Sequence, residues 1–155
     1  MEPAPVALNL DEIKALLPHR PPFLMIERVI ELIPDVRGTG IKTVTAAEPC
    51  FQGQPRERMI FPTALIIEAM AQSAAIGALY PLGPAAADKI PFFTNIQGFE
   101  LLRPVRPGDR LELHVVKDRS FGPSSRVSCE ARVAGELVAR AKLTAAVLSK
   151  DAVNF

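Results

Sequence analysis

The longest apolar stretch of the chain lies between residues 63 and 80, where hydrophobic side chains fall on every side of a predicted helix. Pro62 comes immediately before it, at a position where the first turn of a helix tolerates proline. A helix that is apolar around its whole circumference is normally buried. At 1.5 Å per residue its 18 positions would span about 27 Å, enough to cross a small domain. The pattern therefore predicts one long helix in the core.

The other hydrophobic patterns predict a short helix and a series of strands. Asn9 and Glu12 have the spacing of a capping box, and Pro18 ends the helix that we expect over residues 10–17. Alternating or β-branched apolar runs predict strands over residues 23–33, 41–45, 90–96, 98–105, 110–117, 126–133 and 136–148.

Turn residues separate these strands. Pro34-Asp35 and Gly38-Thr39-Gly40 predict the turn between the first two, and Pro107-Gly108-Asp109 predicts another. Residues 46–61 have no clear periodicity and predict a loop. We therefore expect an α+β fold in which one curved antiparallel sheet accompanies the long helix, and a single domain over residues 1–155.

Composition narrows the class of protein. The chain has 155 residues and a net charge of +1, so it has the size of one domain and no overall attraction for nucleic acid. Cys50 and Cys129 are expected to be free thiols in a reducing compartment. The N-terminus is acidic and contains prolines, unlike a secretory signal, and no uncharged apolar run approaches the ~20 residues of a membrane span. We expect a soluble cytoplasmic protein.

Several common sites are absent from the sequence. It contains no phosphate-binding loop, no dinucleotide-binding glycine motif and no serine-hydrolase elbow. Its only histidines, His19 and His114, have no neighbour at the spacing of metal ligands, so no metal site is predicted. His114 is expected on the solvated face of its strand.

Glu68 is the one side chain whose position alone indicates chemistry. It is a carboxylate in the middle of the apolar helix, and Gln72 follows one turn later on the same face. A buried carboxylate must be paired, protonated or placed at a cavity. Two explanations stay open: a structural glutamate satisfied by Gln72 and backbone donors, or a carboxyl group for general acid–base catalysis.

Three motifs resemble the (3R)-3-hydroxyacyl-acyl carrier protein dehydratases of the FabZ type. Residues 17–24 are L-P-H-R-P-P-F-L, similar to the opening motif of that family. Residues 51–53 (F-Q-G) and 65–72 (L-I-I-E-A-M-A-Q) resemble its central signature, and residues 103–109 (R-P-V-R-P-G-D) resemble its proline-glycine turn. The motifs occur in the family's order with matching gaps.

The resemblance implies the hotdog fold, a long central helix wrapped by a curved antiparallel sheet, assembled as a dimer or a trimer of dimers. It implies acyl-thioester substrates carried on the phosphopantetheine of an acyl carrier protein, with no other cofactor. In the family a histidine of one subunit removes the C2 proton. The helix glutamate of the other subunit helps the C3 hydroxyl to leave, and backbone N–H groups hold the thioester carbonyl.

This sequence departs from the family pattern beside the chemistry. Gln54 stands at the histidine position, and a glutamine amide cannot take up a proton near neutral pH. Thr63 stands where the family has the glycine that lets the substrate approach the backbone. We expect Glu68 to be catalytic. The predicted substrate-binding residues are Gly53, Gln54, Thr63, Ala64 and Gln72.

These departures leave three functions open. The first is a dehydratase-like subunit of fatty-acid or polyketide-type (for example polyene) biosynthesis, inactive or weakly active alone, that supplies Glu68 to a histidine-bearing homologue. The second is a stand-alone thioesterase or atypical dehydratase that uses Glu68. The third is a non-catalytic acyl-binding or assembly protein. Near the proline-glycine turn, Arg103, Arg106 and Arg110 form either a docking surface for an acidic carrier protein or a solvated face.

Overall fold

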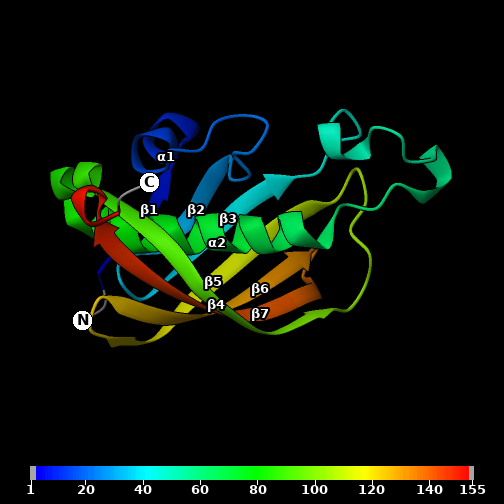
Figure 1. Cartoon of the computed structure of the whole chain (residues 1–155). Coiled ribbons are helices and arrows are strands. Elements are labelled where there is room, and N and C mark those ends of the chain that lie inside the picture. The colour runs from blue at the N-terminus through cyan, green and yellow to red at the C-terminus, as the bar shows by residue number, and fades with distance from the viewer. Residues whose placement is uncertain (1–2, 154–155) are drawn as a thin grey trace.

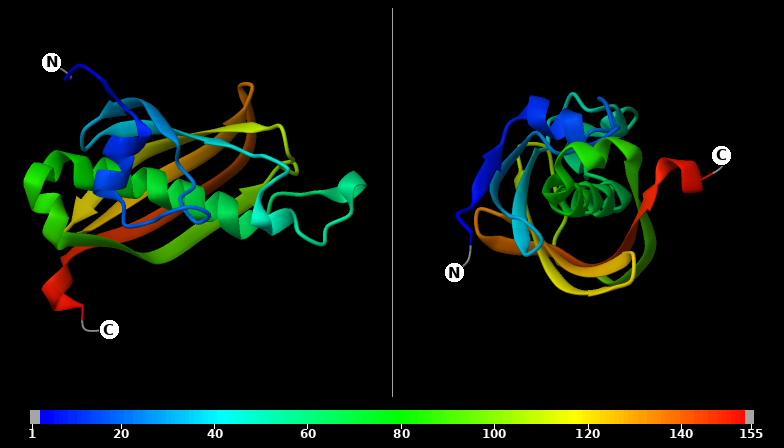
Figure 2. Two further views of the ribbon diagram at one scale, coloured as in Figure 1. Left: turned by 90° about the horizontal axis from the view of Figure 1, so that it is seen from above. Right: turned by 90° about the vertical axis from the view of Figure 1, so that its left-hand side faces the viewer.

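A computed structural model describes residues 3–153 of the chain. Its centre is the helix α2 (Thr63–Leu79), around which one antiparallel sheet curves (Figures 1 and 2). The strands are β1 (Val6–Leu8), β2 (Arg28–Ile33), β3 (Arg37–Thr43), β4 (Lys89–Leu101), β5 (Arg110–Phe121), β6 (Ser124–Val133) and β7 (Glu136–Ser149). Their order in this seven-stranded sheet is β1-β2-β3-β5-β6-β7-β4, so β1 and β4 are its edges. The expected α+β hotdog architecture is confirmed.

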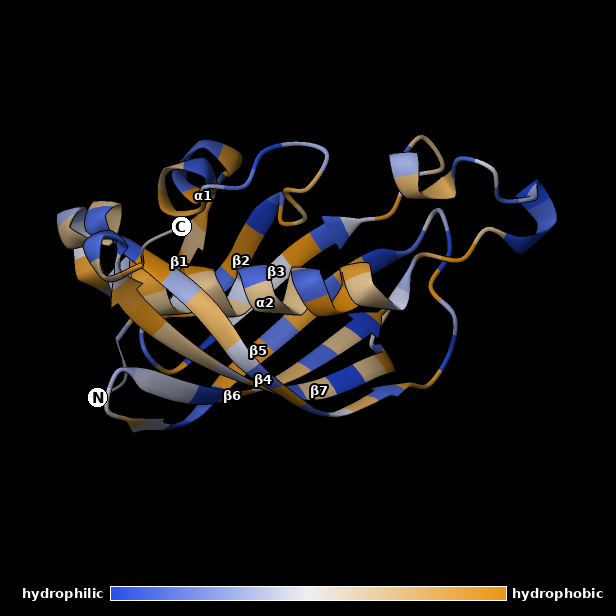
Figure 3. Cartoon of the chain, viewed as in Figure 1, coloured by the Kyte–Doolittle hydropathy of each residue, from blue (hydrophilic) through white to orange (hydrophobic). Residues whose placement is uncertain are grey.

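The long helix lies where the sequence predicts it, but its burial is uneven. Ile66, Met70, Ile76 and Leu79 are fully buried against the sheet, and residues 69–76 are buried throughout. Thr63 and Ala64, which begin the helix, are exposed, and Ile67 and Glu68 are partly exposed. Figure 3 shows hydrophilic bands interrupting the hydrophobic surface of α2. The uniform burial that we expected is therefore wrong for the first turns, which leave an open face on the single chain.

One segment of the chain is long and apolar enough to span a membrane by length and composition. It runs over Thr63–Asp88, which comprises α2 and the 3-10 helix η3 (Tyr80–Asp88). More than half of its most apolar window is buried inside the protein, because the sheet wraps around α2. The apolar composition of this segment is thus explained by its place in the core.

The short N-terminal helix α1 (Leu10–Leu16) begins with the predicted capping box. The Glu12 N–H donates to Asn9 Oδ1 at 3.0 Å, and the Asn9 N–H donates to Glu12 Oε2 at 2.8 Å. Two of the N–H groups that a helix start leaves unpaired are satisfied in this way. Strand β1 precedes the helix and was not predicted from the sequence.

Two strand predictions need correction. The predicted strand over residues 23–33 begins only at Arg28, since a turn occupies residues 21–23. The turn predicted at Pro34-Asp35 is present, with Asp35 at a φ of 64°, but Gly38-Thr39-Gly40 lies inside β3 rather than in that turn. The reason is close packing: a Cβ at Gly40 would collide with the Ser73 hydroxyl of α2. This glycine lets the strand approach the helix.

Further along the chain, the two strands predicted over residues 90–96 and 98–105 are one continuous strand, β4. Its pairing with β7 shifts between Gln97 and Glu100, and Gly98 between them has a positive φ of 59°. Such a bulge allows a strand to bend without ending. The predicted loop over residues 46–61 contains two single-turn 3-10 helices, η1 (Pro49–Phe51) and η2 (Arg56–Arg58). The last 3-10 helix is η4 (Lys150–Ala152).

Candidate active site

Glu68 lies on the open face near the start of α2 and is paired with Gln72. The Gln72 Nε2 group donates to Glu68 Oε1 at 2.8 Å, as the spacing of one helical turn allows. The Glu68 side chain is 26% exposed, whereas Gln72 is only 1% exposed. The carboxylate is thus anchored on its buried side and accessible on the other.

Gln72 also joins the helix to the end of the opening motif and the residue that follows it. Its Nε2 donates to the carbonyl of Phe23 at 2.8 Å, and its Oε1 accepts the N–H of Met25 at 2.8 Å. These contacts fix the orientation of the amide, because a flipped side chain would place donor against donor at Met25. Two motifs that lie far apart in sequence therefore meet at Gln72.

His19 is the residue of this cluster that sequence analysis missed. Its Nε2 lies 3.6 Å from Glu68 Oε1, and its side chain is 26% exposed, like that of Glu68. Its ring packs against Phe23 with 5.9 Å between ring centroids. The sequence assigns His19 no role beside Glu68, and nothing in the spacing of the two residues signals this contact. Its place in the opening motif was the one available hint.

Gln54 occupies a separate region, the loop over residues 50–60. Its Nε2 donates to the carbonyls of Cys50 (2.9 Å) and Ile60 (3.3 Å), and its Oε1 accepts the N–H of Ile60 (3.0 Å). Both amide hydrogens and the carbonyl oxygen are thereby engaged with the backbone of its own loop. Gly53 beside it has a φ of 80°, in the left-handed region that favours glycine.

This loop projects beyond the N-terminal end of α2, and its outer tip is hydrophilic (Figures 1 and 3). Within the described residues of one chain, no hydrogen bond or ion pair joins Gln54 to Glu68. The structure therefore divides the predicted site residues into two groups: Glu68 and Gln72 with His19, and Gly53 with Gln54.

Thr63 and Ala64 lie at the exposed start of α2. Pro62, the N-cap residue, makes no side-chain capping hydrogen bond, and its carbonyl accepts from the N–H groups of Leu65 and Ile66. The N–H groups of Thr63 and Ala64 have no helical acceptor, as at any helix start, and carry the positive end of the helix dipole. They are the kind of donor that can hold a carbonyl oxygen, although substrate binding at these residues stays a prediction.

The three arginines of the predicted docking surface differ in their contacts. Arg103 binds Asp109 at 3.2 Å and Glu136 at 3.3 Å, and Arg110 binds Glu112 at 2.7 Å. Burial opposes the charge of Arg103, but its two acidic partners outweigh this effect and raise the pKa of the guanidinium. Arg106 is exposed and has no ion pair among residues 3–153. Most of the expected basic cluster is therefore neutralised locally.

Other groups in the described part of the chain contribute little reactive chemistry. Burial raises the pKa of the Cys129 thiol to about 12, and burial together with the charge of Glu48 raises the pKa of Cys50. Both cysteines are free thiols, as expected. Over residues 3–153, no group of three or more His, Cys, Asp or Glu side chains could hold a metal ion.

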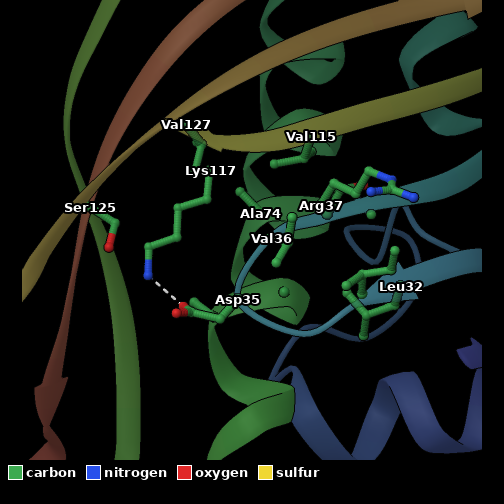
Figure 4. Close-up of a pocket in the computed structure, with 14 residues that line it drawn as sticks. Leu32, Asp35, Val36, Arg37, Ala74, Val115, Lys117, Ser125 and Val127 are labelled. Carbon is green, nitrogen blue, oxygen red and sulfur yellow. Dashed lines mark hydrogen bonds and ion pairs between the residues drawn. The ribbon is translucent and has the colours of Figure 1, made fainter. Parts of the chain in front are cut away.

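A small apolar cavity of about 60 Å³ lies on another face of α2, between the helix and strands β2, β3, β5 and β6 (Figure 4). Ser73 and Gly77 line it from the helix, and an ion pair of Lys117 with Asp35 lies beside it. None of the predicted site residues lines this cavity. It is separate from the cluster around Glu68.

The architecture places the chain in the hotdog class, and solved structures agree. A chain of the dehydratase heterocomplex ApeI:P from Xenorhabdus doucetiae matches with a TM-score of 0.74 at 17% identity, covering 90% of this chain and 92% of that chain. A hot-dog-like protein from Thermanaerovibrio acidaminovorans matches with a TM-score of 0.63 at 20% identity, covering 78% and 87%. At these identities the likeness establishes the fold.

The sequence then establishes the family. Residues 17–142 match the FabA-like domain. The 3-hydroxyacyl-[acyl-carrier-protein] dehydratase FabZ of Paramagnetospirillum magneticum is 41% identical over 143 residues, which are 92% of this chain and 89% of that protein. FabZ of Agrobacterium fabrum is 45% identical over 137 residues, 88% of each chain. The chain therefore belongs to the FabA-like family, among the FabZ-type dehydratases, and the resemblance drawn from the three motifs is confirmed.

Proposed function

We propose that this chain is the Glu68-bearing subunit of a 3-hydroxyacyl-thioester dehydratase and that a histidine-bearing homologue completes its active site. The FabZ-type relatives are named for 3-hydroxyacyl groups on acyl carrier protein, which supports that substrate class here. The substrate arrives on the phosphopantetheine of the carrier protein. The pathway is fatty-acid or polyketide-type biosynthesis.

The observation that carries the proposal is the contrast in chemistry between Glu68 and Gln54. Glu68 is oriented by Gln72 and remains partly exposed, so its carboxyl group is available for proton transfer. Gln54, which stands at the histidine position of the family motif, is an amide that cannot accept a proton near neutral pH, and its polar atoms are bound to its own loop. One chain thus has the acid and lacks the family's base.

A mixed dimer supplies both groups. If each site takes a histidine from one subunit and a glutamate from the other, two copies of this chain make no complete site. One copy with a histidine-bearing homologue makes one. The solved hotdog neighbour from Xenorhabdus doucetiae is a dehydratase heterocomplex, which supports this kind of assembly.

The reaction in such a site is balanced by two proton transfers. The homologue's histidine takes the C2 proton, and the electron pair of the C2–H bond forms the C2–C3 double bond. The C3–O bond breaks, and protonated Glu68 gives its proton to the departing hydroxyl, which leaves as water. N–H groups at the start of α2, those of Thr63 and Ala64, hold the thioester oxygen where negative charge develops.

The free edge of the sheet supports an oligomer. Among residues 3–153, strand β4 pairs only with β7, and its Ile96 (47%) and Leu101 (39%) side chains are exposed. Exposed, unpaired strand edges of this kind pair readily with another chain. We expect this chain to form a dimer or a larger assembly, and sedimentation at micromolar concentration that detects only monomer would contradict this.

A thioesterase remains the second candidate, and one observation favours it. Glu68 Oε2 has no hydrogen-bond partner in the part of the chain that the structure describes, so a single carboxylate is free to activate water. The isolated chain would then hydrolyse acyl thioesters without any partner.

The test compares the isolated chain with a mixed dimer that carries a different affinity tag on each subunit. We expect little turnover of 3-hydroxyacyl or acyl thioesters by the isolated chain. We expect dehydration by the mixed dimer to fall about 10²–10⁴-fold with Glu68→Gln, because the general acid is lost. Glu57→Gln, an exposed glutamate on η2, is the matched control and should leave activity unchanged. Equal dehydration with Glu68→Gln would refute the proposal, and rapid thioester hydrolysis by the isolated chain would favour the thioesterase.

A further inference from the structure

His19 is held beside Glu68 from two directions. The Arg20 guanidinium donates to the carbonyls of Leu17 (2.9 Å) and His19 itself (2.7 Å), which fixes the backbone just after α1. The imidazole packs against the ring of Phe23, whose carbonyl accepts a hydrogen bond from Gln72. Because Gln72 also binds Glu68, the same amide braces both members of the His19–Glu68 pair.

The surroundings of the imidazole indicate which nitrogen faces the carboxylate as a donor. Nε2 lies 3.6 Å from Glu68 Oε1, whereas Nδ1 is buried and has no hydrogen-bond partner within the described range 3–153. A proton on Nδ1 would be buried without an acceptor, which is costly. The tautomer that fits is therefore the one with the proton on Nε2, directed at Glu68.

The two oxygens of Glu68 are consequently in different positions. Oε1 faces two donors, the Gln72 amide at 2.8 Å and the His19 imidazole. Oε2 has no partner among the residues that the structure describes. A carboxyl group whose one oxygen accepts from two donors carries its proton on the other oxygen, so Oε2 is the atom left to donate a proton.

We propose that His19 is a positioning residue for Glu68: it holds Oε1 through Nε2–H and thereby directs Oε2 at the C3 hydroxyl of the thioester substrate. This inference rests on the proposed function. When Oε2 gives up its proton and the carboxylate becomes negative, the contact with His19 becomes a charge-assisted hydrogen bond, which is stronger than a neutral one. The separation of 3.6 Å is long for a hydrogen bond, and such contacts in free enzymes often tighten only around the bound substrate.

The kinetic test uses the mixed dimer with three variants of this chain. His19→Leu removes the donor, and His19→Gln replaces it, because the glutamine amide nitrogen can occupy the place of Nε2. His114→Gln is the matched control: the chain's other histidine lies on β5 and contacts Thr39 of β3 instead. We expect His19→Leu to lower kcat about 10–100-fold with KM changed less than about twofold, since a misplaced catalytic group costs rate rather than binding. His19→Gln should recover most of kcat, and His114→Gln should not change it.

A second measurement needs no activity and uses the isolated chain. Because the chain has two histidines, the imidazole ¹⁵N resonances of His19 and His114 are assigned by His114→Gln alone. We expect Glu68→Ala to shift the His19 ring resonances and to leave those of His114 in place. An unchanged His19 spectrum would overturn the contact itself.

The outcomes separate this inference from the function on which it rests. If Glu68→Gln abolishes dehydration while His19→Leu leaves kcat unchanged, the positioning role is refuted and the proposed function stands. If Glu68→Gln has no effect, the proposed function fails, while the His19 resonances still report whether the two side chains touch. If His19→Leu does not assemble with the homologue, two other measurements test the inference. These are the kcat of His19→Gln against wild type and the His19 ring resonances in Glu68→Ala.

Discussion

Gln72 and Gln54 have the same side chain, but their hydrogen bonds join residues at very different distances along the sequence. Gln72 is buried and connects α2 to Phe23 and Met25, which lie almost 50 positions earlier in the chain. Gln54 is partly exposed, and its partners within residues 3–153 are Cys50 and Ile60, four and six positions away. The first amide holds a carboxylate in place and leaves it accessible, whereas the second closes a loop and has no donor hydrogen left over.

This difference supports the separate roles that we propose for the two regions. Around α2, structural hydrogen bonds support a side chain that can transfer a proton. In the loop over residues 50–60, the Gln54 side chain itself provides the structural hydrogen bonds. The Gln54 amide is bound to the backbone of its own loop and cannot take up a proton near neutral pH, so it is unsuited to act as a base with any partner subunit.

The largest effect on stability is expected from a substitution of Gln72. Gln72→Ala removes hydrogen bonds to Phe23, Met25 and Glu68, and it leaves the buried N–H of Met25 without an acceptor. We expect the free energy of unfolding to fall by about 3 kcal/mol, because unsatisfied buried groups cost more than the average hydrogen bond contributes. Denaturant unfolding at a fixed protein concentration measures this. Gln52→Ala, at an exposed glutamine, is the control, and equal destabilisation by the two variants would contradict the account.

Restoring a histidine in the loop tests the other region. A neutral imidazole has one donor and one acceptor, so Gln54→His cannot reproduce the hydrogen bonds to Cys50 and Ile60 together. We expect the variant to stay at least about 10²-fold below a FabZ relative in dehydration of a 3-hydroxyacyl thioester, because a displacement of about 1 Å costs that much rate. Turnover close to that of the relative would show that the loop tolerates the change and positions the base well.

A smaller effect is expected from Gln54→Ala. Its hydrogen bonds are local and partly exposed to water, so their loss should lower the free energy of unfolding by only about 1 kcal/mol. The loosening should be confined to the loop, where hydrogen exchange of the Ile60 N–H is expected to accelerate while that of Met25 is unchanged. Faster exchange at both residues would mean that the two regions are coupled.

The sequence predicted the parts of the molecule that depend on local pattern. The apolar run from residue 63 located α2, the spacing of Asn9 and Glu12 located the start of α1, and the spacing of Glu68 and Gln72 placed both on one face of α2, where they pair. Each of these signals lies within a single turn or a single element.

What the sequence could not predict depends on contacts between distant elements. Gly40 has the composition of a turn but lies in β3, because α2 packs against it. His19 meets Glu68 because the segment after Pro18 packs against the helix, where Gln72 binds the carbonyl of Phe23. No periodicity or spacing encodes such a meeting, so the histidine of the cluster became visible only in the folded chain.

The most direct test of the central claim is complementation between two inactive proteins. The histidine-bearing homologue is prepared with its own helix glutamate changed to glutamine, which leaves its homodimer with a base and no acid. This chain, with Glu68 and no histidine at position 54, is then assembled with it, and dehydration of a 3-hydroxyacyl thioester is measured. We predict that activity appears only in the mixture and is lost with Glu68→Gln. Activity that is absent from the mixed dimer, or that persists with Glu68→Gln, would contradict the shared site.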